Sequence, residues 1–272
     1  MDREWLFTSL SLAGALLAPL VGLFRRRPCD FASGRAAERA AWRALWAPLL
    51  PTGACVAFLI GWGLSAPDPA ERPPLDAIVL PLLGAALALR AAWRAWQAAA
   101  AGVLPSLGVV GVLRPRIHVD ARVEGLLDEE ALAAALAHER AHLSHRDPLR
   151  ILLANLATDL QLGLPGARER LSHWRHVLEL ARDEQARAAG ADGGALARAI
   201  LVILRHEVGA MPITARLAGD GERLRDRVVR LLAPLPPVMP ARPVLPRLAG
   251  ALVATILLGM LLGEPVLTDA FG

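Results

Sequence analysis

Four long runs with few or no charged side chains dominate the hydrophobic pattern of the chain. Residues 5–24, 44–67 and 248–263 contain no charged side chain, and residues 75–96 contain three. A helix needs about 20 apolar residues to cross a bilayer core of about 30 Å. We therefore expect transmembrane helices at about 5–24, 45–66 and 75–96, and a fourth within 247–272.

The charges that flank these runs predict an orientation. The loop 25–43 carries six arginines and two acidic residues, whereas residues 264–272 carry two acidic residues and no base. Short loops rich in arginine lie on the cytoplasmic side of a membrane. We therefore expect a multi-pass protein of the bacterial cytoplasmic (inner) membrane, with both termini outside and residues 103–246 in the cytoplasm.

The pattern changes at residue 103. Stretches rich in β-branched residues at 103–113 and 115–119 predict a pair of short strands. Further on, apolar residues recur with helical spacing, and Asp128 and Gly190 are typical of a helix start and a helix stop. The expected helices are 128–145, 148–164, 171–189, 195–207 and 223–232, followed by a proline-rich linker at 234–246.

Together these patterns predict a mostly α membrane protein in three parts. Residues 1–102 would hold three spans, and residues 103–246 a cytoplasmic α+β domain inserted between spans three and four. Residues 247–272 would hold the fourth span and a short external tail. The alternative is that some runs are buried core helices of a soluble protein, which the length and lack of charge of the first two runs disfavour.

The amino-acid composition excludes some reactions and some binding partners. All 30 basic residues are arginine, and lysine and tyrosine are absent. Reactions that need a lysine amine or a tyrosine hydroxyl from this chain are therefore excluded. No basic cluster is interleaved with aromatic residues, so we expect no direct binding of nucleic acid. The two cysteines, Cys29 and Cys55, are not expected to form a disulfide in a cytoplasmic setting.

The segment His138-Glu139-Arg140-Ala141-His142 is an H-E-x-x-H motif inside an expected helix. A spacing of four residues places both imidazoles on one face, one turn apart, where they can share a zinc ion. Glu139 can then act as the general base for a metal-bound water.

A catalytic zinc site needs a third protein ligand and one open position. His145 shares a helix face with His138, but a separation of seven residues is a rise of about 10.5 Å, too far for one metal. Glu179 and Asp183 are four residues apart on a later helix. One of these carboxylates can bind the metal while the other holds the far nitrogen of a ligand histidine.

Several segments carry a resemblance to a known family. Residues 138–147 resemble an extended zinc motif with a trailing Arg-Asp pair, and residues 179–183 resemble an E-x-x-x-D element. The strand segment 111–119 and the late helix 227–232 match more weakly. On these residues the chain resembles the membrane zinc metallopeptidases of the bacterial β-lactam-sensor (antirepressor) family, which are gluzincins. It is more distantly similar to the heat-shock and CAAX-prenyl endopeptidases, and the likeness covers most of residues 1–263.

The resemblance implies roles for particular residues. His138, His142 and Glu179 would be the ligands of one Zn²⁺ per chain, and Glu139 would be the general base. Asp183 would orient a ligand histidine, with His138 as the expected partner. The resemblance also implies structural polar contacts near the site from Arg146, Asp147 and Arg227.

The chain departs from the family pattern in two ways. Sensor members carry an external penicillin-binding domain after the fourth span, whereas about nine residues follow it here, and a chain without lysine has no S-x-x-K acylation site. We therefore expect no β-lactam sensing by that route. In the absence of tyrosine another residue must stabilise the oxyanion, and the candidates are His206, Arg227, His173 and His176. Arg182 stands where the family often has cysteine.

The favoured hypothesis is an integral-membrane zinc endopeptidase with a cytoplasm-facing active site. By resemblance, its substrate would be a winged-helix transcriptional repressor, and its input would come through the lipid-embedded bundle or from a separate sensor protein. Two alternatives stay open. One is a quality-control or processing protease for membrane proteins, and the other is a non-catalytic signalling scaffold that keeps a zinc ion.

Overall fold

A computed structural model describes six parts of the chain, and every structural statement below concerns these parts. They are residues 33–65, 75–100, 105–161, 166–209, 217–237 and 253–258.

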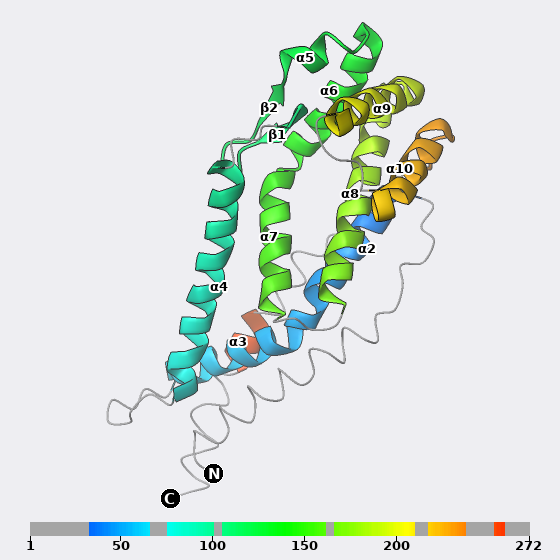
Figure 1. The fold of residues 1–272 in the computed structure, drawn as a ribbon. Coiled ribbons are helices and arrows are strands. Elements are labelled where there is room, and N and C mark those ends of the chain that lie inside the picture. The colour runs from blue at the N-terminus through cyan, green and yellow to red at the C-terminus, as the bar shows by residue number, and fades with distance from the viewer. Residues whose placement is uncertain are drawn as a thin grey trace, which may run out of the picture.

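Helices form most of the described structure, and one short antiparallel pair of strands interrupts them (Figure 1). The first elements are α2 (Gly34–Trp46), a 3₁₀ turn (Ala47–Leu49), α3 (Leu50–Ser65), α4 (Leu75–Ala100), β1 (Leu107–Val110) and β2 (Arg116–Val119). They are followed by α5 (Ala121–Glu124), α6 (Glu129–Ser144), α7 (Asp147–Leu160), α8 (Ala167–Ala188), α9 (Gly193–Gly209) and α10 (Leu217–Leu232).

The prediction of a four-span membrane protein is wrong, because no helix in the described ranges is both long and apolar enough to cross a bilayer. The run expected to span at 45–66 is broken after Trp46, and α3 has 16 residues. At 1.5 Å per residue such a helix is about 24 Å long, short of a core of about 30 Å.

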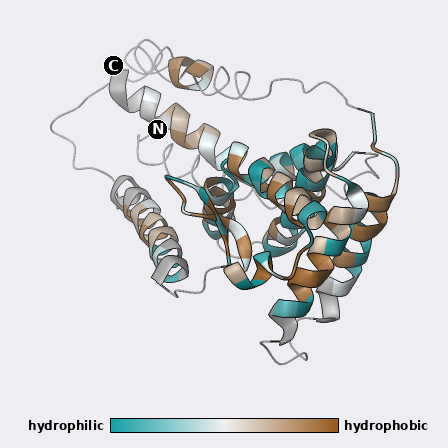
Figure 2. Ribbon diagram, turned by 90° about the horizontal axis from the view of Figure 1, so that it is seen from above, coloured by the Kyte–Doolittle hydropathy of each residue, from teal (hydrophilic) through white to brown (hydrophobic). Residues whose placement is uncertain are grey.

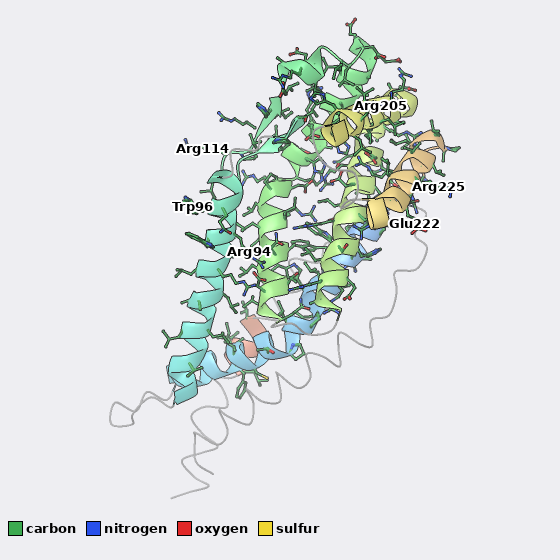
Figure 3. All side chains as sticks on the ribbon, in the orientation of Figure 1. Arg94, Trp96, Arg114, Arg205, Glu222 and Arg225 are labelled. Carbon is green, nitrogen blue, oxygen red and sulfur yellow. The ribbon has the colours of Figure 1, made fainter. Side chains whose placement is uncertain are left out.

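The expected span at 75–96 lies within α4, which is long enough at 26 residues. Its apolar part, however, ends at Arg90 and Arg94. Both guanidiniums pair with Asp159 of α7, at 3.8 and 3.0 Å. Figure 3 labels Arg94 and Trp96 on this helix. The expected span at 5–24 lies outside the described residues, as does 247–272 apart from residues 253–258.

The N-terminal helix α2 occupies part of the segment that hydropathy treats as a loop, residues 25–43. Ala37, Ala41 and Leu45 recur every four residues, so they form one buried stripe. The stripe packs against α8, where Trp174 and Leu178 are almost fully buried. α2 is therefore joined to the segment 103–246 by a shared core rather than separated from it.

Local signals place the helices of segment 103–246 close to their expected positions. α6 begins after Asp128, whose carboxylate accepts a hydrogen bond from the backbone N–H of Ala131 at 2.7 Å. α8 ends before Gly190, which has a φ of +103° that favours glycine. These two ends confirm the predicted start and stop. Four expected helices differ by two to six residues at an end: α7 stops at Leu160, α8 starts at Ala167, α9 runs from Gly193 to Gly209 and α10 starts at Leu217.

α6 packs between α8 and α9 through small side chains. Ala134 lies in one buried cluster with Ala186 of α8 and Leu196 of α9. Because alanine adds little bulk, the backbones of the three helices approach closely. Hydrophobic and hydrophilic residues alternate around the helices in Figure 2, as expected for amphipathic helices that share a core.

The predicted pair of strands is present but shorter than expected. β1 and β2 pair antiparallel, with Leu107 opposite Val119 and Val110 opposite Arg116. The strands end at a turn that begins with Gly111, whose φ is +91°. This hairpin packs against α6, so it lies beside the helix that carries the H-E-x-x-H motif.

Candidate metal centre

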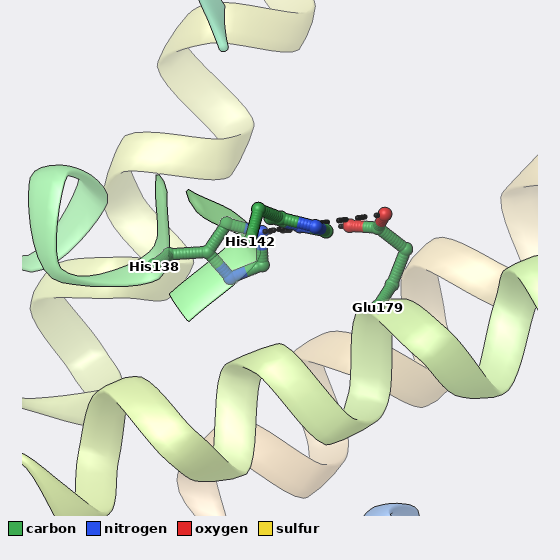
Figure 4. A group of neighbouring side chains, drawn as sticks. All are labelled: His138, His142 and Glu179. Atoms are coloured by element: carbon green, nitrogen blue, oxygen red, sulfur yellow. Dashed lines mark hydrogen bonds and ion pairs between the residues drawn. The ribbon is translucent and has the colours of Figure 1, made fainter. Parts of the chain in front are cut away.

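Two helices bring the expected ligands together. His138 and His142 project from α6 toward Glu179 of α8 (Figure 4). The two Nε2 atoms are 3.0 Å apart. Nε2 of His138 lies 3.5 Å from Oε2 of Glu179, and Nε2 of His142 lies 3.7 Å from Oε1. The three side chains therefore present one nitrogen or oxygen atom each to a common point.

The spacing of these atoms fits a tetrahedral metal site. With zinc–ligand bonds of about 2.0–2.1 Å, neighbouring ligand atoms of a tetrahedron are about 3.4 Å apart. The three separations in the structure, 3.0, 3.5 and 3.7 Å, lie around that value. Two imidazoles and one carboxylate are also the donor types that zinc uses in catalytic sites. The residues therefore fit the metal that the motif implies.

The second nitrogen of each imidazole faces a buried carboxylate. Nδ1 of His142 hydrogen-bonds to Oδ2 of Asp147 at 2.8 Å, and Nδ1 of His138 lies 2.9 Å from Oδ1 of Asp183. An ionised carboxylate can only accept, so we assign the protons to both Nδ1 atoms. The Nε2 lone pairs then face each other at 3.0 Å, which is repulsive unless a proton or a metal cation lies between them.

A tight turn between α6 and α7 brings Asp147 close to the H-E-x-x-H motif on α6. α6 ends at Ser144, and α7 begins at Asp147 after only two residues. Arg146 adopts a left-handed conformation with φ of +51°, which is uncommon for a residue other than glycine. This turn places the first residue of α7 beside His142, which lies in the last turn of α6.

Arginines from other helices hold the two aspartates. Arg227 of α10 donates two hydrogen bonds of 2.9 Å to Asp183, and its Nη1 lies 3.2 Å from Oε2 of Glu179. Arg182 of α8 donates from both Nε and Nη2 to Asp147, the latter at 2.8 Å. Paired contacts of this kind fix the plane of a carboxylate as well as its position.

The charges around the common point also favour a divalent cation. Glu139, Glu179 and Asp183 contribute three formal negative charges, and Arg227 returns one positive charge. The pair of Asp147 with Arg182 is neutral. Two negative charges remain, and a divalent cation would balance them.

The carboxylates around the common point also raise the pKa values of the two histidines. Burial lowers the pKa of His142, but Asp147 and Glu179 outweigh it and raise that pKa from 6.5 to about 9. The pKa of His138 is raised in the same way by Asp183 and Glu179 against burial. Partial burial raises the pKa of Glu179, but Arg227 and the two imidazoles hold it well below its usual range. A metal that binds here must displace protons from the histidines.

Glu139 lies beside the ligands rather than among them. It lines a cavity of about 280 Å³ together with His138, Glu179 and Arg227. The exposed fraction of the Glu179 side chain is 36 %, so the site is open on this side. The rest of the cavity wall is apolar and comes mostly from α9. These residues are Leu107, Ala135, Leu196, Ala199, Ile200, Ile203, Leu204 and Leu224.

Most of the other candidate residues lie away from the three ligands. Nδ1 of His145 lies 3.1 Å from the carbonyl oxygen of Ala141 at the end of α6. Nε2 of His176 lies 3.0 Å from Asp226. Neither His206 nor His173 is among the residues that line the cavity. Of the residues proposed to stabilise an oxyanion, only Arg227 lines it, and that guanidinium already contacts Asp183 and Glu179.

Sequence reasoning missed the direct partner of His142. The resemblance pointed to Asp147 only as a structural polar contact, and it attached no role in the site to Arg182. The available signal was an aspartate five residues after the second histidine, at the start of a new helix. Its distance from His142 depends on the turn at Arg146, which propensity rules do not predict.

Comparisons with models of known protein families, with curated proteins and with solved structures returned no match to this chain. Function is therefore inferred below from the residues and the geometry of the site.

Proposed function

We propose that the protein is a zinc-dependent endopeptidase. The observation that carries the proposal is the convergence of His138, His142 and Glu179, with Glu139 in the adjoining cavity. Within the described part of the chain, three donor residues converge. A structural zinc site usually closes with a fourth protein ligand, whereas a catalytic site keeps that position for water and substrate. The arrangement thus favours catalysis over the scaffold hypothesis.

The proposed chemistry divides between the metal and the protein. When bound, zinc would polarise the scissile carbonyl and lower the pKa of water toward 7. Glu139 takes a proton from the attacking water and later gives it to the leaving amine. It is placed for this role because it follows His138 directly and opens onto the same cavity.

Other residues hold the ligands in place. Asp147 orients His142 through a hydrogen bond to Nδ1, and Asp183, 2.9 Å from Nδ1 of His138, favours a proton on that nitrogen. Arg227 contacts both Asp183 and Glu179. One guanidinium therefore holds the ligand Glu179 and also Asp183, which faces the ligand His138. Because these contacts hold the ligands in place beforehand, the side chains of the site need little rearrangement during the reaction.

The hairpin beside α6 offers a way to align an extended substrate. Among the described strands, β1 pairs with β2 on one side only, so its other edge can accept a further strand. Leu107, the first residue of β1, lines the cavity beside Glu139. A polypeptide that adds to this edge would run past the metal centre, as extended peptides do on other sheet edges.

Two substrate classes are compatible with this chemistry: a single transcriptional repressor, or a range of unfolded proteins. The resemblance of the zinc motifs favours a winged-helix repressor, and a general processing protease would share the same chemistry. A repressor-specific enzyme would cleave a folded repressor at one bond, whereas a processing enzyme would cleave unfolded proteins at several.

The test compares wild-type protein with Glu139→Gln and with a matched control, Glu130→Gln. Glu130 lies in the first turn of the same helix and is exposed, pairing with Arg198. We expect about one zinc per chain in all three proteins. Cleavage of an unfolded casein or a winged-helix repressor should fall at least about 10³-fold in Glu139→Gln only. Zinc in wild type without any cleavage would contradict the peptidase, and absence of zinc from metal-replete wild type would contradict the metal centre as well.

A further inference from the structure

A chain of polar contacts runs from the N-terminal helix α2 to the candidate metal centre. It begins at Glu38, whose relative exposure is 6 %. Nε1 of Trp174 donates to Oε1 of Glu38 at 3.3 Å, and Nη2 of Arg150 donates to the same oxygen. Glu38 thus lies against α8 and α7, on the face of α2 that packs into the core.

Arg150 continues the chain toward the site. Its Nη1 donates to Oδ1 of Asp147 at 3.2 Å. The guanidinium lies 4.9 Å from the ring centroid of Trp42 and 5.7 Å from that of Trp174. Both separations are within the range of a cation–π contact. Arg150 is therefore held between two aromatic rings while it joins Glu38 to Asp147.

The chain of contacts ends at His142, a proposed metal ligand. Asp147, with a relative exposure of 1 %, accepts from Arg150 and Arg182 and contacts Nδ1 of His142. The four charged groups of this network are two carboxylates and two guanidiniums, so the network is neutral. If Glu38 were removed, two guanidiniums would face one carboxylate, leaving a positive charge next to a ligand of a divalent cation.

From these contacts we infer that Glu38 is a positioning residue of the metal centre. It holds Arg150 so that Asp147 keeps both its position and its negative charge available to His142. The inference rests on the proposed metal site but does not require that the site hydrolyses peptides. It makes α2, outside the segment expected to form the active domain, part of the metal centre.

A consequence of this link is reciprocal coupling. If docking of α2 strengthens metal binding, then metal binding strengthens docking of α2 by the same factor. Any partner that lifts α2 from α8 would weaken the metal centre without touching a ligand.

The experiment measures zinc affinity by competition with a chromogenic chelator, in the full-length protein. The test variant is Glu38→Gln, and the matched control is Glu184→Gln. Glu184 is also a buried carboxylate between α2 and α8, where it accepts from Ser33 at 2.8 Å and from the backbone of Arg35 at 3.2 Å. Its hydrogen bonds and ion pair go to Ser33, Gly34 and Arg35 rather than to Asp147, so its loss weakens the same interface without changing the network.

We expect Glu38→Gln to lower zinc affinity about tenfold and Glu184→Gln to leave it within about twofold of wild type. Arg150→Gln in the Glu38→Gln background removes the surplus positive charge, so it should restore most of the affinity. A purely structural role would not predict that rescue. Circular dichroism checks that each variant is folded.

Two outcomes would overturn the inference, and they are distinguishable. If wild type binds zinc and Glu38→Gln binds it equally well, the role of Glu38 is refuted while the metal centre stands. If wild type binds no zinc, the metal centre and the inference fail together. An equal loss of affinity in both glutamate variants, with no rescue by Arg150→Gln, would assign the effect to α2 packing and also refute the inference.

Discussion

At the scale of single residues, each of the two ligand imidazoles is backed by its own pair of an aspartate and an arginine. Each presents Nδ1 to a buried aspartate, and each aspartate is held by an arginine from another helix. Both Nε2 atoms are thereby aimed at one point. The two sets are His138, Asp183 and Arg227, and His142, Asp147 and Arg182.

The titration of His142 predicts how metal binding depends on pH. Its metal-free pKa is raised from 6.5 to about 9, because Asp147 and Glu179 outweigh burial. Zinc binds the neutral imidazole, so it competes with this proton over that interval. We expect the apparent zinc affinity to rise between these two values by up to about tenfold per pH unit for each proton that zinc displaces. Chelator competition at stepped pH measures the slope, and a flat profile over the interval would contradict the assignment.

At the scale of elements, the contact between α2 and α8 carries much of the architecture. Trp174 of α8 is fully buried, and its ring centroid lies 5.1 Å from that of Trp42 of α2 in a tilted arrangement. The N-terminus of α2 is tied to Glu184, and Gly34 lies where a Cβ would meet the backbone carbonyl carbon of Leu180 at 2.9 Å. Glycine is therefore required at this crossing for α2 to approach α8.

A pair of glycine substitutions tests this crossing. Gly34→Ala should lower the free energy of unfolding by about 1–3 kcal/mol, because α2 must move away from Leu180. Gly221→Ala is the control, since Gly221 lies in α10 with nothing within 4 Å of an added Cβ. There we expect a gain of about 0.5–1 kcal/mol from helix propensity. Urea unfolding measures both, and equal effects of the two substitutions would argue against close packing at Gly34.

At the scale of the whole molecule, the candidate site lies where segments distant in sequence meet. Ligands come from α6 and α8, a supporting arginine from α10, and the network behind His142 from α7 and α2 (Figure 1). On the outer faces, charged side chains such as those labelled Arg205, Glu222 and Arg225 are exposed (Figure 3). Among the described residues, most buried charged side chains thus lie at the site or in the network behind His142.

This buried charge predicts loss of stability in acid. Burial raises the pKa of Asp147 and Asp183, but Arg182 with His142 and Arg227 with His138 outweigh it, and both pKa values are lowered. A carboxyl whose pKa is depressed by folding stabilises the protein above its unfolded pKa of about 4, and that contribution is lost as pH falls. Each such group contributes about 2–3 kcal/mol when the depression is large.

The measurement is urea unfolding of metal-free protein between pH 7 and pH 3. We expect the free energy of unfolding to fall steeply below about pH 4, where these carboxyls take up protons in the unfolded chain but not yet in the folded protein. Asp147→Asn should flatten this dependence, since an amide does not titrate. A wild-type stability that is constant down to pH 3 would show that these aspartates are not paired in solution as they are in the structure.

Local patterns in the sequence determine several features by themselves. The spacing of His138 and His142 places them on one helix face, because four residues make about one turn. Asp128 and Gly190 mark helix ends, since capping depends on the side chain and the φ angle of one residue. Glu179 and Asp183 also share a face for the same geometric reason. These predictions need no knowledge of what each helix packs against.

Only the tertiary structure decides which neighbours these residues meet. The contact of Asp147 with His142 depends on a left-handed Arg146, and that of Asp147 with Arg182 on how α7 crosses α8. The erroneous prediction of four spans has a related cause. Hydropathy indicates that a segment is removed from water. The break after Trp46 and the pairing of α4 with α7 depend instead on how the helices pack against one another. Contacts between residues far apart in the chain follow from packing, and no local periodicity encodes packing.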